Sequence, residues 1–224
     1  MDIIDSFNKL TLGKYDEVKT ISQDETLEDV DRMVGIISVL TDRPEEEILH
    51  LPIHEFTELS SKTAFLSGND FQGGMVAKKY QVGRWELIPV TDYRKLETCQ
   101  YIDFKTYAAD PDNHLVELLS VILVPKGHRY NEGYDILEIQ QSIRDGMTVT
   151  DGVTLVGFFL TLFKKLIVDS LHYSREEAER LPKGRKREKI LERIKEQETL
   201  LGINGDGSDV WTPPRRPVGV PGMM

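Results

Sequence analysis

The stretch DGVTLVGFFLTLFKKLIVDSL, Asp151 to Leu171, is the most apolar part of this chain. Its uncharged run from Gly152 to Phe163 is cut by Lys164 and Lys165, whereas a helix that crosses a bilayer needs about 20 mainly apolar residues. The run is therefore too short to span a membrane. A helix that is apolar nearly all round is typical of a position surrounded by other helices. We expect it to be the central helix of a bundle, or else to expose a face that another chain covers.

The composition is that of a soluble globular protein. Of the 224 residues, 39% are hydrophobic and 29% are charged, unlike a disordered or membrane chain. The N-terminal residues MDIIDSFNKL carry acids where a secretory signal carries bases, so we expect the protein to stay in the cytosol. The single cysteine, Cys99, has no partner for an internal disulfide or a CxxC site, and we expect a small half-buried apolar residue.

The charge is uneven along the chain. Residues 1–60 hold fifteen Asp or Glu against five Lys or Arg, which accounts for the whole net charge of −10. A nucleic-acid partner requires clustered positive charge, and the one basic run is KGRKREK, Lys183 to Lys189. We expect this run to form a solvated helix with ion pairs, and no nucleic acid as the main partner. The acids that interleave with the run and follow it are Glu188, Glu192, Glu196 and Glu198.

An acidic unit of short helices is predicted over residues 1–70. Thr26 with Asp29 forms a capping-box pattern at the start of one helix. Either Thr41 or Asp42 is expected to cap the next helix, whose first turn holds a proline and three glutamates. The apolar stripes that mark these helices include Leu27, Val30, Val34, Ile37 and Leu40, and then Ile53, Phe56, Leu59, Thr63 and Leu66.

A β-hairpin or ribbon is predicted over residues 71–90. The segment MVAKKYQVGRWELIPV changes from a helical to an alternating apolar pattern around a break at Gly83, and Pro89 ends it. A lone hairpin is only marginally stable in water, so we expect this one to lie against helices.

A helical bundle is predicted over residues 91–201, followed by a flexible, extended Pro/Gly-rich tail over residues 202–224. The fold class is therefore mainly α, a multi-helix bundle with a small hairpin insertion. On the helix from Thr91, one face is expected to hold Tyr93, Leu96, Cys99 or Gln100, Ile102 or Asp103, and Phe104. The predicted helix starts are Asp110 with Pro111, Asp135 with Glu138, Thr148 with Asp151, and Ser174 with Glu177.

No pattern of catalytic or metal-binding residues is present in the sequence. His50 and His54 have helical spacing, but Pro52 lies between them and breaks the helix that would align them. The glycine-rich stretch GNDFQGG, residues 68–74, lacks the Lys-Ser or Lys-Thr of a phosphate-binding loop. We expect no enzyme activity, no metal and no cofactor.

Two stretches carry a resemblance to a known family. IISVLTDRPEEEILHLPIHEFTELSSKTAFL (36–66) and LLSVILVPKGHRYNEGYDILEIQQSI (118–143), together with MTVTDGVTLVGFFLTLFKKL (147–166), resemble phage tail assembly chaperones and related virion morphogenesis proteins of tailed phages. The similarity covers roughly residues 27–171 and lies in helices and apolar positions. It implies an α-helical, non-enzymatic protein that keeps the tape-measure protein soluble in the host bacterial cytoplasm during tail assembly.

Two alternatives remain open beside this resemblance. The protein could instead be a permanent virion subunit of the tail, connector or capsid, held by its neighbours through the C-terminal tail, or a host-directed or regulatory adaptor. Its expected partners are the tape-measure protein, other virion proteins or further copies of itself, and neither nucleic acid nor membrane. The residues predicted to bind a partner are Phe158, Phe159, Phe163, Trp211, Arg215 and Arg216.

Overall fold

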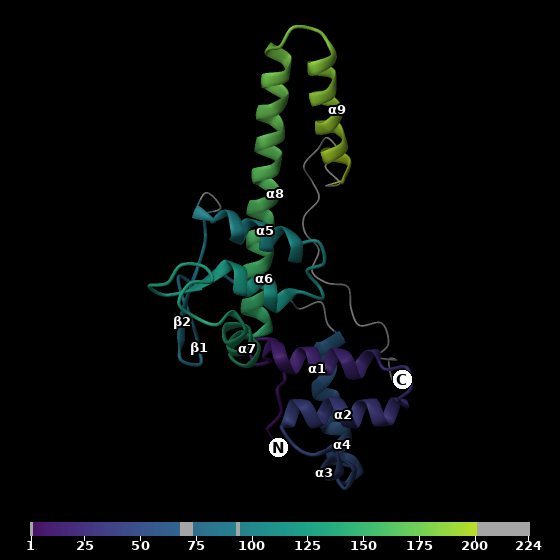
Figure 1. The fold of residues 1–224 in the computed structure, drawn as a ribbon. Helices are drawn as coiled ribbons and strands as arrows, with labels where there is room; N and C mark the ends of the chain where they lie inside the picture. The colour runs from purple at the N-terminus through teal and green to yellow at the C-terminus, as the bar shows by residue number, and fades with distance from the viewer. Residues whose placement is uncertain (1, 68–73, 93–94, 201–224) are drawn as a thin grey trace.

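A computed structural model of the chain describes residues 2–67, 74–92 and 95–200 (Figure 1). These residues form nine α-helices, one 3-10 helix and three short strands, so the predicted mainly α fold with a small β element is confirmed. The tail over residues 202–224 lies outside the described part. The helices are α1 (Leu12–Gln23), α2 (Asp29–Thr41), α3 (Glu45–Leu49), α4 (Ile53–Lys62), α5 (Thr98–Tyr107), α6 (Leu115–Ile122), α7 (Ile136–Gly146), α8 (Val149–Arg180) and α9 (Arg185–Leu200), the 3-10 helix is η1 (Thr63–Ser67), and the strands are β1 (Tyr80–Val82), β2 (Trp85–Pro89) and β3 (Leu123–Pro125).

The main core is built around α6, which packs against α5, α7 and α8. Leu118, Leu119 and Ile122 of this helix are fully buried. Gly152 lets α8 approach closely, because a Cβ at this position would lie 3.2 Å from side-chain carbons of both Leu119 and Leu12. The helix predicted to be central therefore shares that position with the much shorter α6.

The N-terminal helices belong to the same core. Leu10, Leu12, Ile36 and Leu40 are buried in one cluster with the apolar residues of α6, α7 and α8. A second, smaller cluster lies between α2, α3 and α4 and consists of Val34, Ile37, Ile48 and Leu59. The acidic helices are thus joined to the rest of the described chain by buried apolar contacts.

Two predicted helix starts are confirmed. The Asp135 carboxylate accepts a hydrogen bond from the backbone N–H of Leu137 at 2.9 Å, at the start of α7. The Thr148 hydroxyl accepts one from the backbone N–H of Asp151 at 3.2 Å, at the start of α8. In both places a short polar side chain satisfies a helix N–H that has no partner within the helix.

Two other predicted starts, at Thr26 and at Asp110, were wrong because a local turn forms at each place instead. Asp24 accepts hydrogen bonds from the N–H and the hydroxyl of Thr26, and α2 begins only after Glu28. Asp110 accepts a hydrogen bond from the side-chain amide of Asn113, and α6 begins only after His114. Side chains of Asp compete with the backbone in this way, which favours a turn over the first helical turn.

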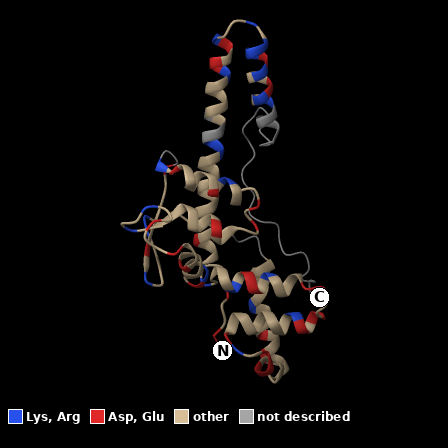
Figure 2. Ribbon diagram, in the orientation of Figure 1, with Lys and Arg blue, Asp and Glu red and all other residues tan. Residues whose placement is uncertain are grey.

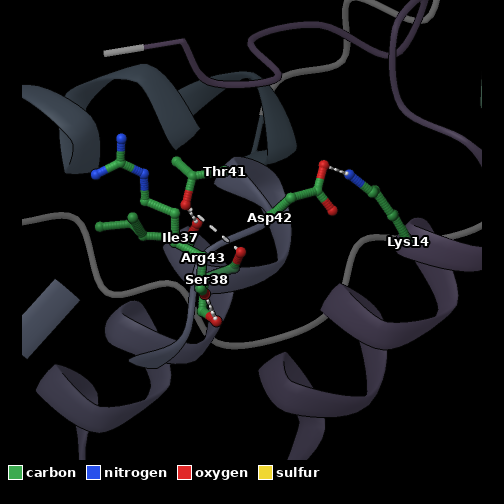
Figure 3. A network of polar contacts seen from close by, with 6 residues as sticks. All are labelled: Lys14, Ile37, Ser38, Thr41, Asp42 and Arg43. Carbon is green, nitrogen blue, oxygen red and sulfur yellow. Dashed lines mark hydrogen bonds and ion pairs between the residues drawn. The ribbon is translucent and has the colours of Figure 1, made fainter. Parts of the chain in front are cut away.

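The end of α2 differs from the prediction that Thr41 or Asp42 caps α3. Both residues close α2, and Pro44 takes the N-cap position of α3. Asp42 has a left-handed backbone, with a φ of 55°, and its N–H donates to the carbonyl of Ser38. Figure 3 shows the Asp42 carboxylate pairing with Lys14 of α1, at 2.5 Å. The helix terminus is thereby tied to the neighbouring helix.

Helix α8 has no break at Ser174, where a new helix was predicted to start. It runs continuously over 32 residues to Arg180 and ends before Pro182. No glycine or proline lies between Phe163 and Pro182, so nothing interrupts the backbone hydrogen bonds of the helix in that stretch. The pattern Ser174 to Glu177 fits a helix start, but it is equally compatible with a helix interior.

The predicted hairpin is present, and the structure adds a third strand to it. Strands β1 and β2 pair antiparallel, with Val82 opposite Trp85, and β3 continues the sheet with Leu87 opposite Pro125. The residues of β3 follow the apolar residues of α6 without a turn signal, so their sequence is equally compatible with a longer helix. Pairing with β2, a tertiary contact, decides its conformation.

Helix α5 begins at Thr98 rather than at Thr91. Of the alternatives left open for its inner face, Gln100 is 2% exposed, whereas Cys99 is exposed and not half-buried as expected. The Gln100 amide donates a 2.5 Å hydrogen bond to the carbonyl of Val121, near the end of α6. This carbonyl lies in the last turn of a helix, where no backbone donor follows it.

Replacing Gln100 with Met is expected to lower the free energy of unfolding by about 1–3 kcal/mol, because the buried Val121 carbonyl loses its donor while the side-chain volume is kept. Urea unfolding followed by circular dichroism measures the loss. The control is Gln141→Met, since Gln141 is exposed and its side chain, among the described residues, bonds only to Asp145 of its own helix. Equal stability of Gln100→Met and the parent protein would contradict the prediction.

The sheet is also held by a charge cluster on its strands. The carboxylate of Glu86 on β2 lies 2.8 Å from Lys79 Nζ and 2.7 Å from Lys126 Nζ. Lys79 directly precedes β1, and Lys126 directly follows β3. Hydrogen bonds from Lys126 and Lys79 lower the pKa of Glu86 to about 2. The folded protein therefore holds this carboxylate ionised more firmly than the unfolded chain does.

Because the pKa of Glu86 is lower in the folded state than its ordinary value of 4.5, the carboxylate contributes stability above pH 4.5 and loses it as pH falls toward 2. Glu86→Gln is expected to destabilise the protein at neutral pH, and the difference from the parent should shrink over that acidic range. Urea unfolding at a series of pH values measures it. A difference that stays constant from neutral pH to pH 3 would contradict the assignment.

Candidate binding surface

Helix α8 leaves the core half-way along its length. In its first half Val153, Leu155, Val156 and Phe159 are buried, and the main core of the described residues extends no further along α8 than Phe163. From Lys164 onward the helix projects away from the body, and α9 returns beside it (Figure 1). We call residues 164–200 the arm: the second half of α8, the turn after it and α9.

The arm is a two-helix hairpin with a single buried seam. Leu171 and Ala178 of α8 and Ile194 of α9 are 6%, 0% and 3% exposed. Two antiparallel helices cover only one stripe of each other, so other faces of both helices, as far as their side chains are described, are open. Two apolar side chains lie on these open faces, Val168 at 37% exposure and Tyr173 at 65%.

The three predicted phenylalanines have different positions. Phe159 is 1% exposed and packs against Phe104 of α5, with 5.1 Å between ring centroids, so it belongs to the core and does not reach a surface. Phe163 is half-buried against the same ring at 4.9 Å. Phe158 is 38% exposed. The other predicted contacts, Trp211, Arg215 and Arg216, lie outside the described residues.

A second apolar surface, missed by the sequence reasoning, lies beside Phe163. Tyr101 of α5 is 37% exposed, and its ring lies 5.9 Å from that of Phe163. Ile102, the next residue of α5, is 56% exposed. We call Tyr101, Ile102 and Phe163 the α5–α8 face. The sequence left Ile102 or Asp103 open for the inner face of this helix, and of the two Asp103 is half-buried while Ile102 is exposed.

A third apolar surface lies where α3 meets α4, at the opposite end of the molecule from the arm (Figure 1). Leu49 and Ile53 are 61% and 78% exposed, although Ile53 was predicted to begin a buried stripe. Ile53 is the first residue of its helix and lies beyond the contact that buries Leu59. Glutamates flank this pair on both sides in the sequence: those at positions 45–47 are exposed, and Glu55 is half-buried. We call residues 45–55 the α3–α4 corner.

The charges divide between the two ends. Figure 2 shows Lys and Arg prevailing near the turn of the arm and Asp and Glu at α3. The predicted ion pairs of the basic run with Glu188 and Glu192 are not formed; the side chains of Glu196 and Glu198 are outside the description. Among the residues that the structure describes, no hydrogen bond or ion pair involves the side chains of Lys183, Arg185, Lys186, Arg187 and Lys189.

The described ranges contain neither a membrane-spanning helix nor a cluster of metal ligands. No helix there is long and apolar enough to cross a bilayer. Within the same ranges, no three His, Cys, Asp or Glu side chains gather closely enough to hold a metal ion. His50 contacts the backbone carbonyl of Glu46 through Nδ1 at 2.7 Å, within its own short helix.

The chain gives no match to protein-family models, to curated proteins or to solved structures. The arm, the α5–α8 face and the α3–α4 corner each present apolar side chains on helices, as surfaces that bind other proteins do.

Proposed function

We propose that this protein is a non-enzymatic tail assembly chaperone of a tailed phage, which binds the tape-measure protein before the tail is built. The observation that carries the proposal is the arm. It extends a core helix by more than four turns beyond the last core residue, and α9 covers it on one side. A fold gains little stability from such an extension, whereas a partner helix gains a long surface to pack on.

The apolar side chains of the arm and of the α5–α8 face support a helical, apolar partner. Tyr101, Ile102, Val168 and Tyr173 are between 37% and 65% exposed, and all four lie on helices. Helices bind one another by setting apolar residues at three- and four-residue spacing into the grooves of the partner. The resemblance of residues 27–171 to tail assembly chaperones implies the tape-measure protein as that partner.

Co-expression with the tape-measure protein of the same phage tests the proposal. The full chain should keep the tape-measure protein in the soluble fraction and co-purify with it. The double variant Ile102→Asp, Tyr173→Asp should lose both effects while keeping its melting temperature, because both side chains are more than half exposed. The matched control is Leu137→Asp, which places a charge on an apolar side chain that is 68% exposed on α7, away from both surfaces.

Purified virions distinguish the chaperone from a permanent virion subunit. A chaperone should be missing from virions analysed by mass spectrometry, whereas a tail, connector or capsid subunit would be present in many copies. A tape-measure protein that is equally soluble without this chain would contradict the chaperone role. In the structural alternative, the C-terminal tail with Trp211, Arg215 and Arg216 would be the segment that neighbouring subunits hold.

A further inference from the structure

The two ends of the molecule carry opposite charge next to exposed apolar groups. The turn of the arm and the first turns of α9, residues 181–189, hold five basic side chains and one acid; we call this segment the arm tip. At the α3–α4 corner, four glutamates lie in sequence around the exposed Leu49 and Ile53. At the arm tip, Pro182 is exposed and Leu181 is half-buried. Each segment therefore combines apolar side chains at the surface with charges of one prevailing sign.

The glutamates of the corner have few partners within the molecule. Among the described residues, Glu45, Glu46 and Glu55 form no ion pair, and Glu47 reaches Arg43 only at 3.9 Å. The first turn of α3 favours negative charge through its free N–H groups, which accounts for acids there but leaves their outer surface open. The basic side chains of the arm tip likewise form no ion pair with a described residue.

The corner and the arm tip cannot meet within one molecule. They lie at opposite ends of the structure (Figure 1), and α8 alone, with 32 residues, is about 48 Å long at 1.5 Å per residue. Exposed charges that far apart do not attract measurably at physiological ionic strength, where the screening length is about 8 Å. Two molecules are needed to bring the surfaces together.

We propose that the arm tip of one copy of this protein docks on the α3–α4 corner of a second copy. The two segments are complementary in charge, and Leu49 and Ile53 supply an apolar centre with a charged rim, as at protein interfaces. The contact joins two different surfaces, so each pair of bound copies leaves one arm tip and one corner free. Such an interface continues into a chain unless it closes into a ring. This inference goes beyond the chaperone role and does not depend on it.

The arm tip fits a protein acid patch better than a nucleic acid. Glu188 lies within the basic segment and Glu192 follows one turn later, where phosphates would be repelled. The chain as a whole carries a net charge of −10, which opposes binding to a polyanion. A second copy of the protein, in contrast, presents the glutamates of its α3–α4 corner close together in the sequence. It is also present at the same concentration as the first copy.

Sedimentation velocity of the full chain at low salt tests the proposal. We expect species larger than the 25.6 kDa monomer, growing with protein concentration, and their loss when the salt is raised to about 0.5 M. Neutralising the arm tip (Lys183→Gln, Arg185→Gln, Lys186→Gln) or the corner (Glu45→Gln, Glu46→Gln, Glu47→Gln) should each weaken association at least about tenfold. Unchanged melting temperatures would show that both variants fold.

Mixing the two neutralised variants gives the sharpest outcome. The intact arm tip of the corner variant should bind the intact corner of the arm variant, and the complex should stop at one copy of each. The matched control is Lys78→Gln, Lys95→Gln, Lys105→Gln, which makes the same change of charge at exposed positions outside the arm. This control should associate like the parent protein.

Three results would overturn the proposal. The first is a parent protein that remains monomeric at low salt and high concentration. The second is association that persists in either neutralised variant, since other surfaces would then carry it. The third is a monomer that binds a short DNA duplex through the arm tip, because the ligand of the basic side chains would then be nucleic acid.

Discussion

A charge in place of Phe159 is expected to unfold the protein. The Phe159 side chain is 1% exposed and packs against the fully buried Phe104, so an aspartate there would be buried without a partner. Burying an unpaired charge costs several kcal/mol, and loss of the phenyl ring adds about 3–5 kcal/mol. The sum of these two costs is comparable with the whole free energy of unfolding of a typical domain, about 5–15 kcal/mol. Phe159→Asp should therefore lose the near-UV circular dichroism and the cooperative thermal transition of the parent.

The adjacent residue provides the control. Phe158 has the same side chain on the same helix but is 38% exposed, so Phe158→Asp should cost less than about 2 kcal/mol and leave the protein folded. The sequence left two outcomes open for Phe159, namely unfolding or loss of association, and its burial selects unfolding. A Phe159→Asp protein with the melting temperature of the parent would show that α8 is not core at this position.

Removal of the arm is expected to abolish binding of the tape-measure protein while the body stays folded. In a chain that ends at Lys165, both described core clusters are complete, because neither contains a residue beyond Phe163. The melting temperature should therefore change by only a few degrees, which corresponds to about 1 kcal/mol at this size. Co-purification of the tape-measure protein should be lost, because this shorter chain lacks Val168, Tyr173 and α9. Differential scanning calorimetry and pull-down measure the two effects separately.

A chain that ends at Leu200 distinguishes the contribution of the arm to partner binding from that of the C-terminal tail. It keeps the whole arm and removes Trp211, Arg215 and Arg216. The sequence predicts that deleting the tail leaves the melting temperature unchanged and weakens partner binding, because Trp and Arg are common anchors of interfaces. Full binding by this chain would assign the interaction to the arm alone. Collapse of folding in the shorter chain would show instead that the arm stabilises the body.

Polar side chains at helix ends were good predictors only where no rival local bond existed. Thr148 and Asp135 cap α8 and α7 as their sequences indicate. Thr26 and Asp110, with equally good patterns, bond instead to Asp24 and Asn113 and form turns. The pattern of residue types is the same in both cases, and the competing hydrogen-bond partner decides the outcome.

Burial of individual apolar residues was harder to predict than the helices that carry them. Leu59 and Ile53 belong to one apolar stripe of the sequence, yet they are 2% and 78% exposed. Phe158 and Phe159 are adjacent, and one of them lies in the core while the other reaches solvent. The candidate surfaces were therefore predicted only in part: Phe158 and Phe163 were named as partner-binding residues, whereas Tyr101 was not named and Ile102 was expected, as the alternative to Asp103, on the inner face of its helix.

The sequence alone determined that this protein is mainly helical, that the apolar run in α8 is too short for a membrane, and that Gly83 marks a hairpin. These properties depend on local spacing, on capping side chains and on the conformational limits of Gly and Pro, all of which act within a few residues. Tertiary structure alone decided that Leu123 to Pro125 form a strand, that α8 continues beyond the core, and that the charges gather at opposite ends. Those features depend on which distant segments pack together, since a strand needs a partner for its backbone groups and a helix face is buried only where another element covers it.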